Sequence, residues 1–241
     1  LHSFPTRRSS DLIANQMVKF DPTRDLRGAL VSHKAKNHAA ILEPKKAGEL
    51  LRAIDGYDGH PVTRLAMQLS ALLFVRPGEL RHSEWTEFDF DAAIWRIPGE
   101  KMKGRLEHVV PLAKQTLALL ETLRGLTGDG CYVFPSIRTP ARPMSENTVN
   151  AALRRLGYSS DEMTAHGFRA MASTLLNESG KWSADAIERA LAHKDKDEVR
   201  AAYHRGAHWG ERVEMANWWA DYLDTLRTGA QVIPIVRRKP A

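Results

Sequence analysis

The stretch from Thr164 to Tyr203, which begins Thr-Ala-His-Gly-Phe-Arg, gathers side chains suited to phosphate chemistry within 40 residues. His166 and Arg169 are three residues apart, so on a helix they would share one face. His193 follows the next helical pattern, and Tyr203 comes ten residues later. An arginine binds phosphate through two N–H groups, a histidine transfers protons near neutral pH, and a tyrosine can attack as a nucleophile. The stretch therefore predicts phosphoryl transfer.

An arginine upstream of this stretch is predicted to lie at a helix entrance. Pro77 suits the first turn of a helix, which puts Arg76 where backbone N–H groups attract anions. Glu79 comes one turn later and can reach back toward Arg76. The pair is therefore either part of an anion site or a structural cap of the helix.

The residue pattern changes to that of strands in the middle of the chain. Residues 94–97 alternate as a strand does, residues 107–112 read as a partner, and residues 132–135 read as a short third strand or an extended segment. The basic turn between the first two carries Lys101 and Lys103, and it is either a solvated turn or a means of delivering a lysine to a substrate. Most other segments have helical apolar spacing. The pattern predicts an α+β fold that is mainly α-helical with a small antiparallel three-stranded sheet.

Composition narrows the class of partner. The formal net charge of +6 favours a polyanion, with nucleic acid first among the candidates. The single Cys131 excludes an internal disulfide and a zinc site built from several cysteines, and its apolar neighbours predict that it is buried. No apolar run approaches the roughly 18 residues that a membrane span needs. No Gly-rich phosphate loop is present, so ATP use is not implied.

Four segments are expected along the chain. Residues 1–12 have no helical or strand period and resemble a translated sequencing-adapter scar, so they are predicted to be non-native. Residues 13–40 are polar and basic, which predicts a linker or the end of an upstream domain. Residues 41–228 carry the patterns of one compact domain, and residues 229–241 form a C-terminal tail.

Three motifs in the right order resemble the tyrosine recombinase (phage integrase) family, in its prophage and genomic-island branch. Arg76-Pro77-Gly78-Glu79-Leu80 resembles the first arginine box, and His166-Gly167-Phe168-Arg169 resembles the second. Leu191-Ala192-His193-Lys194, followed by Tyr203, resembles the closing box. The resemblance covers about residues 41–228, which would be the catalytic domain, and residues 13–40 would then be a remnant of the upstream core-binding domain.

The resemblance implies covalent DNA cleavage. Tyr203 would attack a scissile DNA phosphodiester, forming a 3′-phosphotyrosine and releasing a 5′-hydroxyl, and rejoining would then need no ATP. His166 would accept the tyrosine proton, and Lys103 would protonate the leaving oxygen. Lys103 matches the family pattern better than Lys101, which stays the alternative. The outcome would be integration or excision of a mobile element.

The remaining implied roles concern the phosphate. Arg76 and Arg169 would bind its non-bridging oxygens, and His193 would donate a further hydrogen bond. Glu79 would orient Arg76 or His166 rather than touch DNA. The resemblance implies no cofactor and no metal.

The implied partners are double-stranded DNA attachment sites, a homotetramer of the chain on DNA, and DNA-bending and excision accessory proteins, with no membrane. The implied location is the cytoplasm, at the nucleoid, in a bacterium or a phage-infected cell. Two alternatives stay open, a type IB topoisomerase and a non-catalytic DNA-binding remnant of an integrase. Relaxation without exchange would favour the first, and failure to capture a nicked substrate covalently would favour the second.

Overall fold

Prolines begin the first three helices of the described structure, as the sequence predicts. They open α2 (Pro44–Asp55), α3 (Pro61–Leu73) and α4 (Pro77–Arg81). The fixed φ of proline suits a first helical turn, where its missing N–H loses no hydrogen bond. Most residues of α3 are buried, so this helix lies at the centre of the fold.

The structure is a computed structural model, and it describes residues 16, 19, 38–193 and 208–229. The chain divides into two units, residues 1–37 and residues 38–241, and all the elements below belong to the second. This unit begins three residues before the predicted domain start at residue 41. Tyr203 lies outside the described residues.

Among the described residues there are five more helices and two short 3-10 helices. They are α5 (Lys114–Thr127), α6 (Thr148–Arg155), α7 (Gly167–Ser179), α8 (Ala184–Ala190), α10 (Trp209–Thr228), η2 (Trp85–Glu87) and η3 (Gly99–Lys101). Gly180 ends α7 with a φ of 63°, a left-handed conformation that glycine adopts easily. The Ser183 hydroxyl caps α8 by accepting a hydrogen bond from the Ala186 N–H at 3.2 Å. Both ends were predicted from the sequence.

The predicted three-stranded antiparallel sheet is present. Its strands are β1 (Phe88–Asp89), β2 (Ile94–Ile97) and β3 (His108–Pro111), in that spatial order. In the β2–β3 register, Ile97 lies opposite His108. The two strands therefore form a hairpin whose connection carries both candidate lysines.

The third strand of the sheet is β1, whereas the sequence predicted residues 132–135. Val133 and Phe134 are fully buried, but the Val133 N–H donates to the Ser83 carbonyl at 3.0 Å and the Phe134 carbonyl accepts from Met144 at 2.7 Å. Their apolar character thus reflects burial under the loops rather than a place in the sheet. A separate hairpin follows, formed by β4 (Pro135–Ser136) and β5 (Thr139–Pro143).

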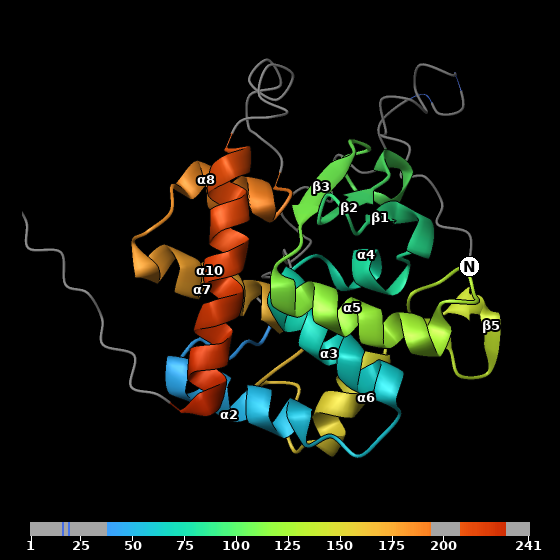
Figure 1. Ribbon diagram of the computed structural model, residues 1–241, viewed down its shortest axis with the longest axis horizontal. Helices are drawn as coiled ribbons and strands as arrows, with labels where there is room; N and C mark the ends of the chain where they lie inside the picture. The colour runs from blue at the N-terminus through green and yellow to red at the C-terminus, as the bar shows by residue number, and fades with distance from the viewer. Residues whose placement is uncertain (1–15, 17–18, 20–37, 194–207, 230–241) are drawn as a thin grey trace, which may run out of the picture. The chain divides into compact units, whose positions relative to one another are not determined.

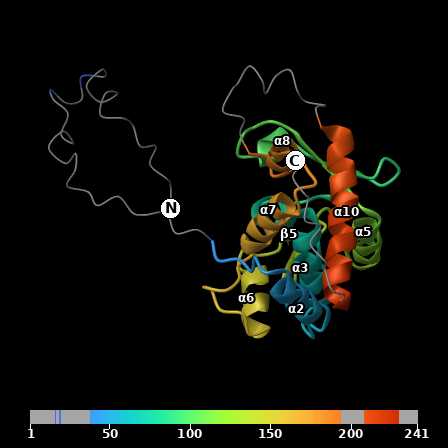
Figure 2. The same ribbon diagram turned by 90° about the vertical axis from the view of Figure 1, so that its left-hand side faces the viewer.

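The last helix packs across the helical layer. In Figure 1, α10 runs beside α2 at one end and α8 at the other, and Figure 2 shows α5 lying alongside it. Trp219 is fully buried, and its indole N–H donates to the Ala71 carbonyl of α3 at 2.9 Å. In the described ranges, no helix is long and apolar enough to cross a membrane.

Candidate active site

Arg76 is held at the N-terminus of α4 by a carboxylate one turn later. Its guanidinium donates to Glu79 Oε1 at 2.7 Å, and its backbone N–H donates to Glu79 Oε2 at 2.9 Å. The Glu79 side chain is only 4% exposed, so the pair is shielded from water on the carboxylate side. The predicted contact between the two residues is therefore confirmed, and it fixes the direction of the Arg76 side chain.

Arg169 lies in the first turn of α7 and reaches the same region. It donates to the Phe74 carbonyl at 3.2 Å and to the Leu191 carbonyl. Burial and, after it, the nearby Arg76 lower the pKa of Arg169 to about 10, so the side chain stays charged at neutral pH. Two guanidinium groups brought this close favour an anion between or beside them.

The turn after α8 joins both arginines to His193. Arg76 donates to the Ala192 carbonyl at 3.0 Å, next to the Leu191 carbonyl that Arg169 binds. Ala192 has a φ of 47°, a left-handed conformation that is unfavourable for alanine. The turn leads directly to His193, whose Nδ1 lies 2.6 Å from Glu188 Oε2 on the exposed surface. The arginines thus hold the backbone that presents this histidine.

His166 is the N-cap residue of α7, so it lies immediately before the helix rather than on it. The Thr164 hydroxyl accepts from the Gly167 N–H at 3.1 Å. The His38 ring stacks on the His166 ring at a centroid distance of 4.3 Å. Burial lowers the pKa of His166 below its usual value, and the nearby charges of His38 and Arg169 add to this effect. A neutral imidazole is therefore favoured, and this form can accept a proton.

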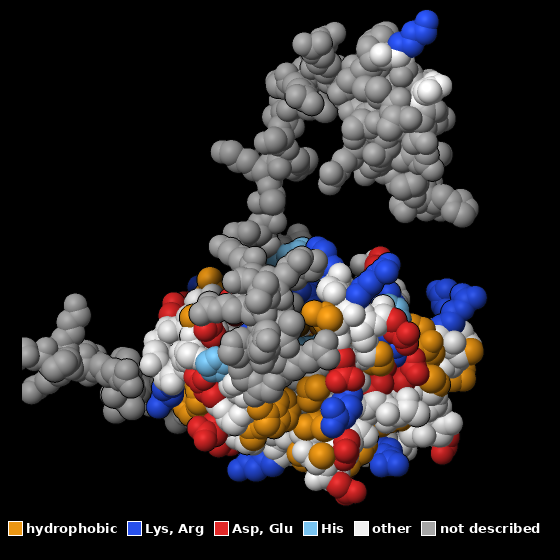
Figure 3. All heavy atoms as spheres, turned by 90° about the horizontal axis from the view of Figure 1, so that it is seen from above, with side chains coloured by type: hydrophobic (Ala, Val, Ile, Leu, Met, Phe, Trp, Pro, Cys, Tyr) orange, Lys and Arg blue, Asp and Glu red, His pale blue; other side chains and the backbone are white. Residues whose placement is uncertain are grey.

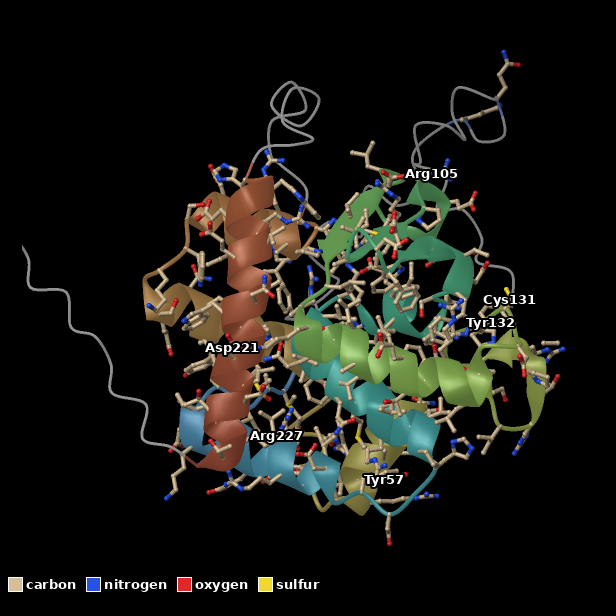
Figure 4. All side chains as sticks on the ribbon, viewed as in Figure 1. Tyr57, Arg105, Cys131, Tyr132, Asp221 and Arg227 are labelled. Atoms are coloured by element: carbon tan, nitrogen blue, oxygen red, sulfur yellow. The ribbon has the colours of Figure 1, made fainter. Side chains whose placement is uncertain are left out.

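Lys103 and Lys101 have opposite surroundings. Lys103 is exposed in a β-turn that the Arg105 N–H closes by donating to the Met102 carbonyl at 3.0 Å. Figure 4 shows Arg105 at the tip of the hairpin. Lys101 instead contacts two carboxylates and is 21% exposed. The turn predicted from the sequence is confirmed, whereas the choice of catalytic lysine stays a prediction.

One open groove of about 900 Å³ brings several predicted site residues together. The predicted residues that line it are Arg76, Glu79, Lys103 and His166, and the alternative Lys101 lines it too. Arg169 and His193 are connected to it through the shared turn described above. The groove thus combines cationic groups with a neutral imidazole, which suits the binding and transfer of a phosphate group.

Sequence reasoning missed two neighbours of this groove. Tyr132 lines it and is half-buried, although the strand pattern predicted a buried side chain. Cys131 is exposed, contrary to the predicted burial, and Figure 4 shows both residues near the β4–β5 hairpin. The apolar run that begins at Cys131 wrongly predicted burial of its first two residues, because only Val133 and Phe134 are buried.

His108 is a buried imidazole close enough to Arg76 and Arg169 for their charges to affect its pKa. It is 8% exposed on β3, and its Nε2 has no hydrogen-bond partner. Burial, followed by the charge of Arg212, lowers its pKa to about 3, and smaller contributions come from Arg169 and Arg76. His108 is therefore neutral at physiological pH, and it adds no positive charge to the site.

The groove is lined by carboxylates as well as by cations, because Glu79, Glu84 and Glu146 lie among its Arg and Lys side chains. On the described surface seen in Figure 3, Lys and Arg side chains lie among Asp and Glu. Within residues 38–193 and 208–229, no group of three or more His, Cys, Asp or Glu side chains could hold a metal ion.

Comparison with known proteins gives a family match over most of the chain. The model of the phage integrase family matches residues 40–208. The integrase of Enterobacteria phage P4 is 44% identical over 229 residues, covering 89% of this chain and 52% of that protein. Prophage integrase IntA of Escherichia coli K12 is 38% identical over 212 residues, covering 88% of this chain and 51% of that protein. The chain thus spans about half the length of the curated relatives it matches.

Solved structures show the same fold at lower identity. The integrase from mycobacterium phage Brujita superposes with a TM-score of 0.57 at 17% identity, covering 93% of this chain and 70% of that one. A lambda integrase tetramer bound to a Holliday junction gives a TM-score of 0.57 at 21% identity, covering 78% of this chain and 56% of that one.

Proposed function

The chain belongs to the phage integrase family, and from that membership we propose that it is a site-specific DNA recombinase that cleaves and rejoins DNA through a covalent phosphotyrosine. The observation that carries the proposal is the convergence of Arg76 and Arg169 on one turn beside the groove. Two guanidinium groups from distant parts of the chain, with a lysine and a neutral histidine nearby, form a site for a phosphodiester.

The arginines would bind and stabilise the phosphate. Arg76 and Arg169 keep N–H groups beyond those bonded to protein, because each guanidinium has five. These groups would bind the non-bridging oxygens and offset the negative charge that develops in the transition state. His193, beside the same turn, would donate a further hydrogen bond. Glu79 would keep Arg76 in place.

In the proposed step one bond to phosphorus forms as another breaks, and one proton is accepted for each proton that is donated. The Tyr203 oxygen forms a bond to phosphorus while the bond from phosphorus to the 5′-oxygen breaks. His166 accepts the tyrosine proton, consistent with its lowered pKa, and Lys103 donates a proton to the 5′-oxygen. Attack by that 5′-hydroxyl, or by one from another strand, reverses the step without ATP.

The proposed partners follow from the relatives. Lambda integrase has been solved as a dimer bound to a core site and as a tetramer bound to a Holliday junction. We extend this to double-stranded attachment sites and a homotetramer for the present chain, with DNA-bending and excision proteins as further partners. The site of action would be the bacterial cytoplasm, at the nucleoid.

Covalent capture tests the proposal. The unchanged protein is incubated with nicked duplexes tiled across the DNA that flanks its gene, and adducts are separated in denaturing gels. Tyr203→Phe should bind the duplex yet form no adduct. Tyr132→Phe is the matched control, because Tyr132 also lines the groove, and it should keep adduct formation.

The outcomes separate the alternatives. No adduct with the unchanged protein would favour the non-catalytic DNA-binding remnant. An adduct that survives Tyr203→Phe but not Tyr132→Phe would move the nucleophile to Tyr132. Relaxation of supercoiled DNA without exchange between two sites would favour a type IB topoisomerase.

A further inference from the structure

Lys101, which lines the groove two residues before Lys103, is bound by three acceptors. Its ammonium group contacts Glu84 Oε1 at 2.6 Å, Glu87 Oε1, and the His82 carbonyl at 3.0 Å. A lysine has three N–H donors, so these contacts occupy all of them. Burial lowers the pKa of Lys101, but hydrogen bonds to Glu84 and Glu87 outweigh it and raise the pKa overall. Lys101 therefore has no proton directed at the groove.

The carboxylates that bind Lys101 are themselves fixed. The Glu87 side chain is 5% exposed, and its second oxygen accepts from the Trp95 indole N–H at 2.9 Å. Trp95 is fully buried in β2. Glu84 pairs with Tyr132 in an isolated bridge. The segment from His82 to Glu87, which follows α4, is thus a rigid base against which Lys101 is held.

The backbone between Lys101 and Lys103 is short and hydrogen-bonded, so the position of Lys101 constrains that of Lys103. The Lys101 N–H donates to the Pro98 carbonyl and the Met102 N–H to the Gly99 carbonyl, both at 3.0 Å. The Met102 side chain is buried, so only one residue, itself in the core, separates Lys101 from Lys103. A Cβ on Gly99 would lie 2.7 Å from the Arg105 carbonyl oxygen, so the two sides of the loop are already in close contact.

We propose that Lys101, with Glu84 and Glu87, is a positioning residue that fixes the turn from which Lys103 delivers its proton. The residues after Lys103, from Gly104 to Glu107, are exposed, so the buried contacts of this turn lie on its Lys101 side. The inference rests on the proposed role of Lys103, and it assigns a function to the ion-pair cluster that the family motifs do not include. It also gives a physical reason for two lysines so close together.

The test uses a leaving group that needs no acid. In a nicked duplex of the flanking DNA, the bridging 5′-oxygen at the cleavage position is replaced by sulfur. A thiol is far more acidic than an alcohol and departs as the thiolate without protonation. Lys103→Ala should slow adduct formation about 100-fold on the oxygen substrate and by less than about 3-fold on the sulfur substrate.

The key variant replaces the ion pair by neutral groups. Lys101→Met combined with Glu87→Gln avoids leaving a lone buried carboxylate. It should slow cleavage about 10-fold with oxygen, and sulfur should restore the rate, because loss of position acts through the acid step. Lys114→Met is the control, since Lys114 makes an exposed ion pair with Asp221 and does not line the groove.

Lys101→Arg distinguishes positioning from direct acid catalysis. An arginine keeps the charge and can bind both carboxylates, but it is a poor proton donor at neutral pH. A positioning role predicts a rate within about 3-fold of the unchanged protein on the oxygen substrate. A rate as slow as that of Lys103→Ala would instead make Lys101 the acid and would overturn the inference.

Hydrogen exchange measures the turn without DNA. The Arg105 amide should exchange at least about 10-fold faster in the Lys101→Met/Glu87→Gln variant, because it is bonded within the turn. An unchanged exchange rate, or a cleavage defect that sulfur does not restore, would overturn the inference. If sulfur fails to restore Lys103→Ala itself, the assigned acid in the proposed function is wrong instead.

Discussion

Arg76 and Arg169 donate hydrogen bonds to the carbonyl groups of two consecutive residues, Ala192 and Leu191. The Arg76 contact spans 116 positions of the chain, and the Arg169 contact spans 22. The two side chains therefore have fixed directions before any phosphate is bound, and the turn that precedes His193 is fixed with them. A phosphate bound as proposed above would therefore be coupled to the geometry of this turn through the same two guanidinium groups.

Arg169→Lys should reduce adduct formation by about 100-fold or more, because the compact ammonium group of a lysine lacks the planar fork of donors with which Arg169 binds the Phe74 and Leu191 carbonyls and would bind a phosphate. Single-turnover cleavage at saturating protein measures this. Arg52→Lys is the matched control, because Arg52 also donates to two carbonyls, those of Leu226 and Arg227, away from the groove. Equal loss of cleavage in both variants would indicate a general loss of folding rather than a role at the phosphate.

The rate of cleavage should fall on the acid side with a midpoint below pH 6.5, the ordinary pKa of histidine. His166 must be neutral to accept a proton, and burial and then His38 lower its pKa. His38→Ala removes the stacked ring and its electrostatic effect on His166, so it should move the midpoint upward. His38→Phe keeps a ring on His166 and should give a smaller shift. A midpoint unchanged by His38→Ala would contradict the assigned contact or the role of His166.

Gly48→Ala should destabilise the domain by about 1–3 kcal/mol, because a Cβ at Gly48 of α2 would overlap the Leu226 carbonyl of α10. Gly210→Ala is the contrasting variant. Gly210 lies in α10 with nothing within 4 Å of an added Cβ, so alanine should stabilise by about 0.5 kcal/mol. Urea unfolding measures both, and similar midpoints for the two variants would contradict the close packing of α2 on α10.

The features that the sequence predicted correctly are those with local causes. Pro44, Pro61 and Pro77 start helices because proline restricts its own φ, and the contact between Arg76 and Glu79 follows from one turn of helix. The order of the motifs indicated the family without any knowledge of long-range contacts.

The features that it missed depend on contacts between distant segments. Nothing near Val133 in the sequence shows that its N–H pairs with Ser83 instead of a sheet neighbour. The family pattern favours Lys103 over Lys101, but nothing in the sequence shows that Glu84 and Glu87 approach Lys101 and bind it. Whether a side chain is buried depends on which distant segments pack against it. The sequence of one segment alone therefore does not show its burial.

The free energy of unfolding should decrease as the pH falls from 7 to 5, and His108 should account for about 2 kcal/mol of that decrease. Burial and the charge of Arg212 lower the pKa of His108 to about 3, whereas in the unfolded chain it lies near 6.5. The unfolded state therefore binds a proton that the folded state does not. The stability is present above pH 6.5 and is lost progressively toward pH 3.

His108→Leu removes this titration, so its unfolding free energy should depend less on pH than that of the unchanged protein. Urea unfolding gives the change in unfolding free energy between pH 7 and pH 5 for the unchanged protein and for the variant. The contributions of the other titrating groups cancel when one change is subtracted from the other. His108→Asn keeps a polar side chain and should show the same weaker dependence as His108→Leu, even where the two variants differ in stability at pH 7. Parallel dependences for the unchanged protein and both variants would mean that His108 is not a buried imidazole with a lowered pKa in the folded protein.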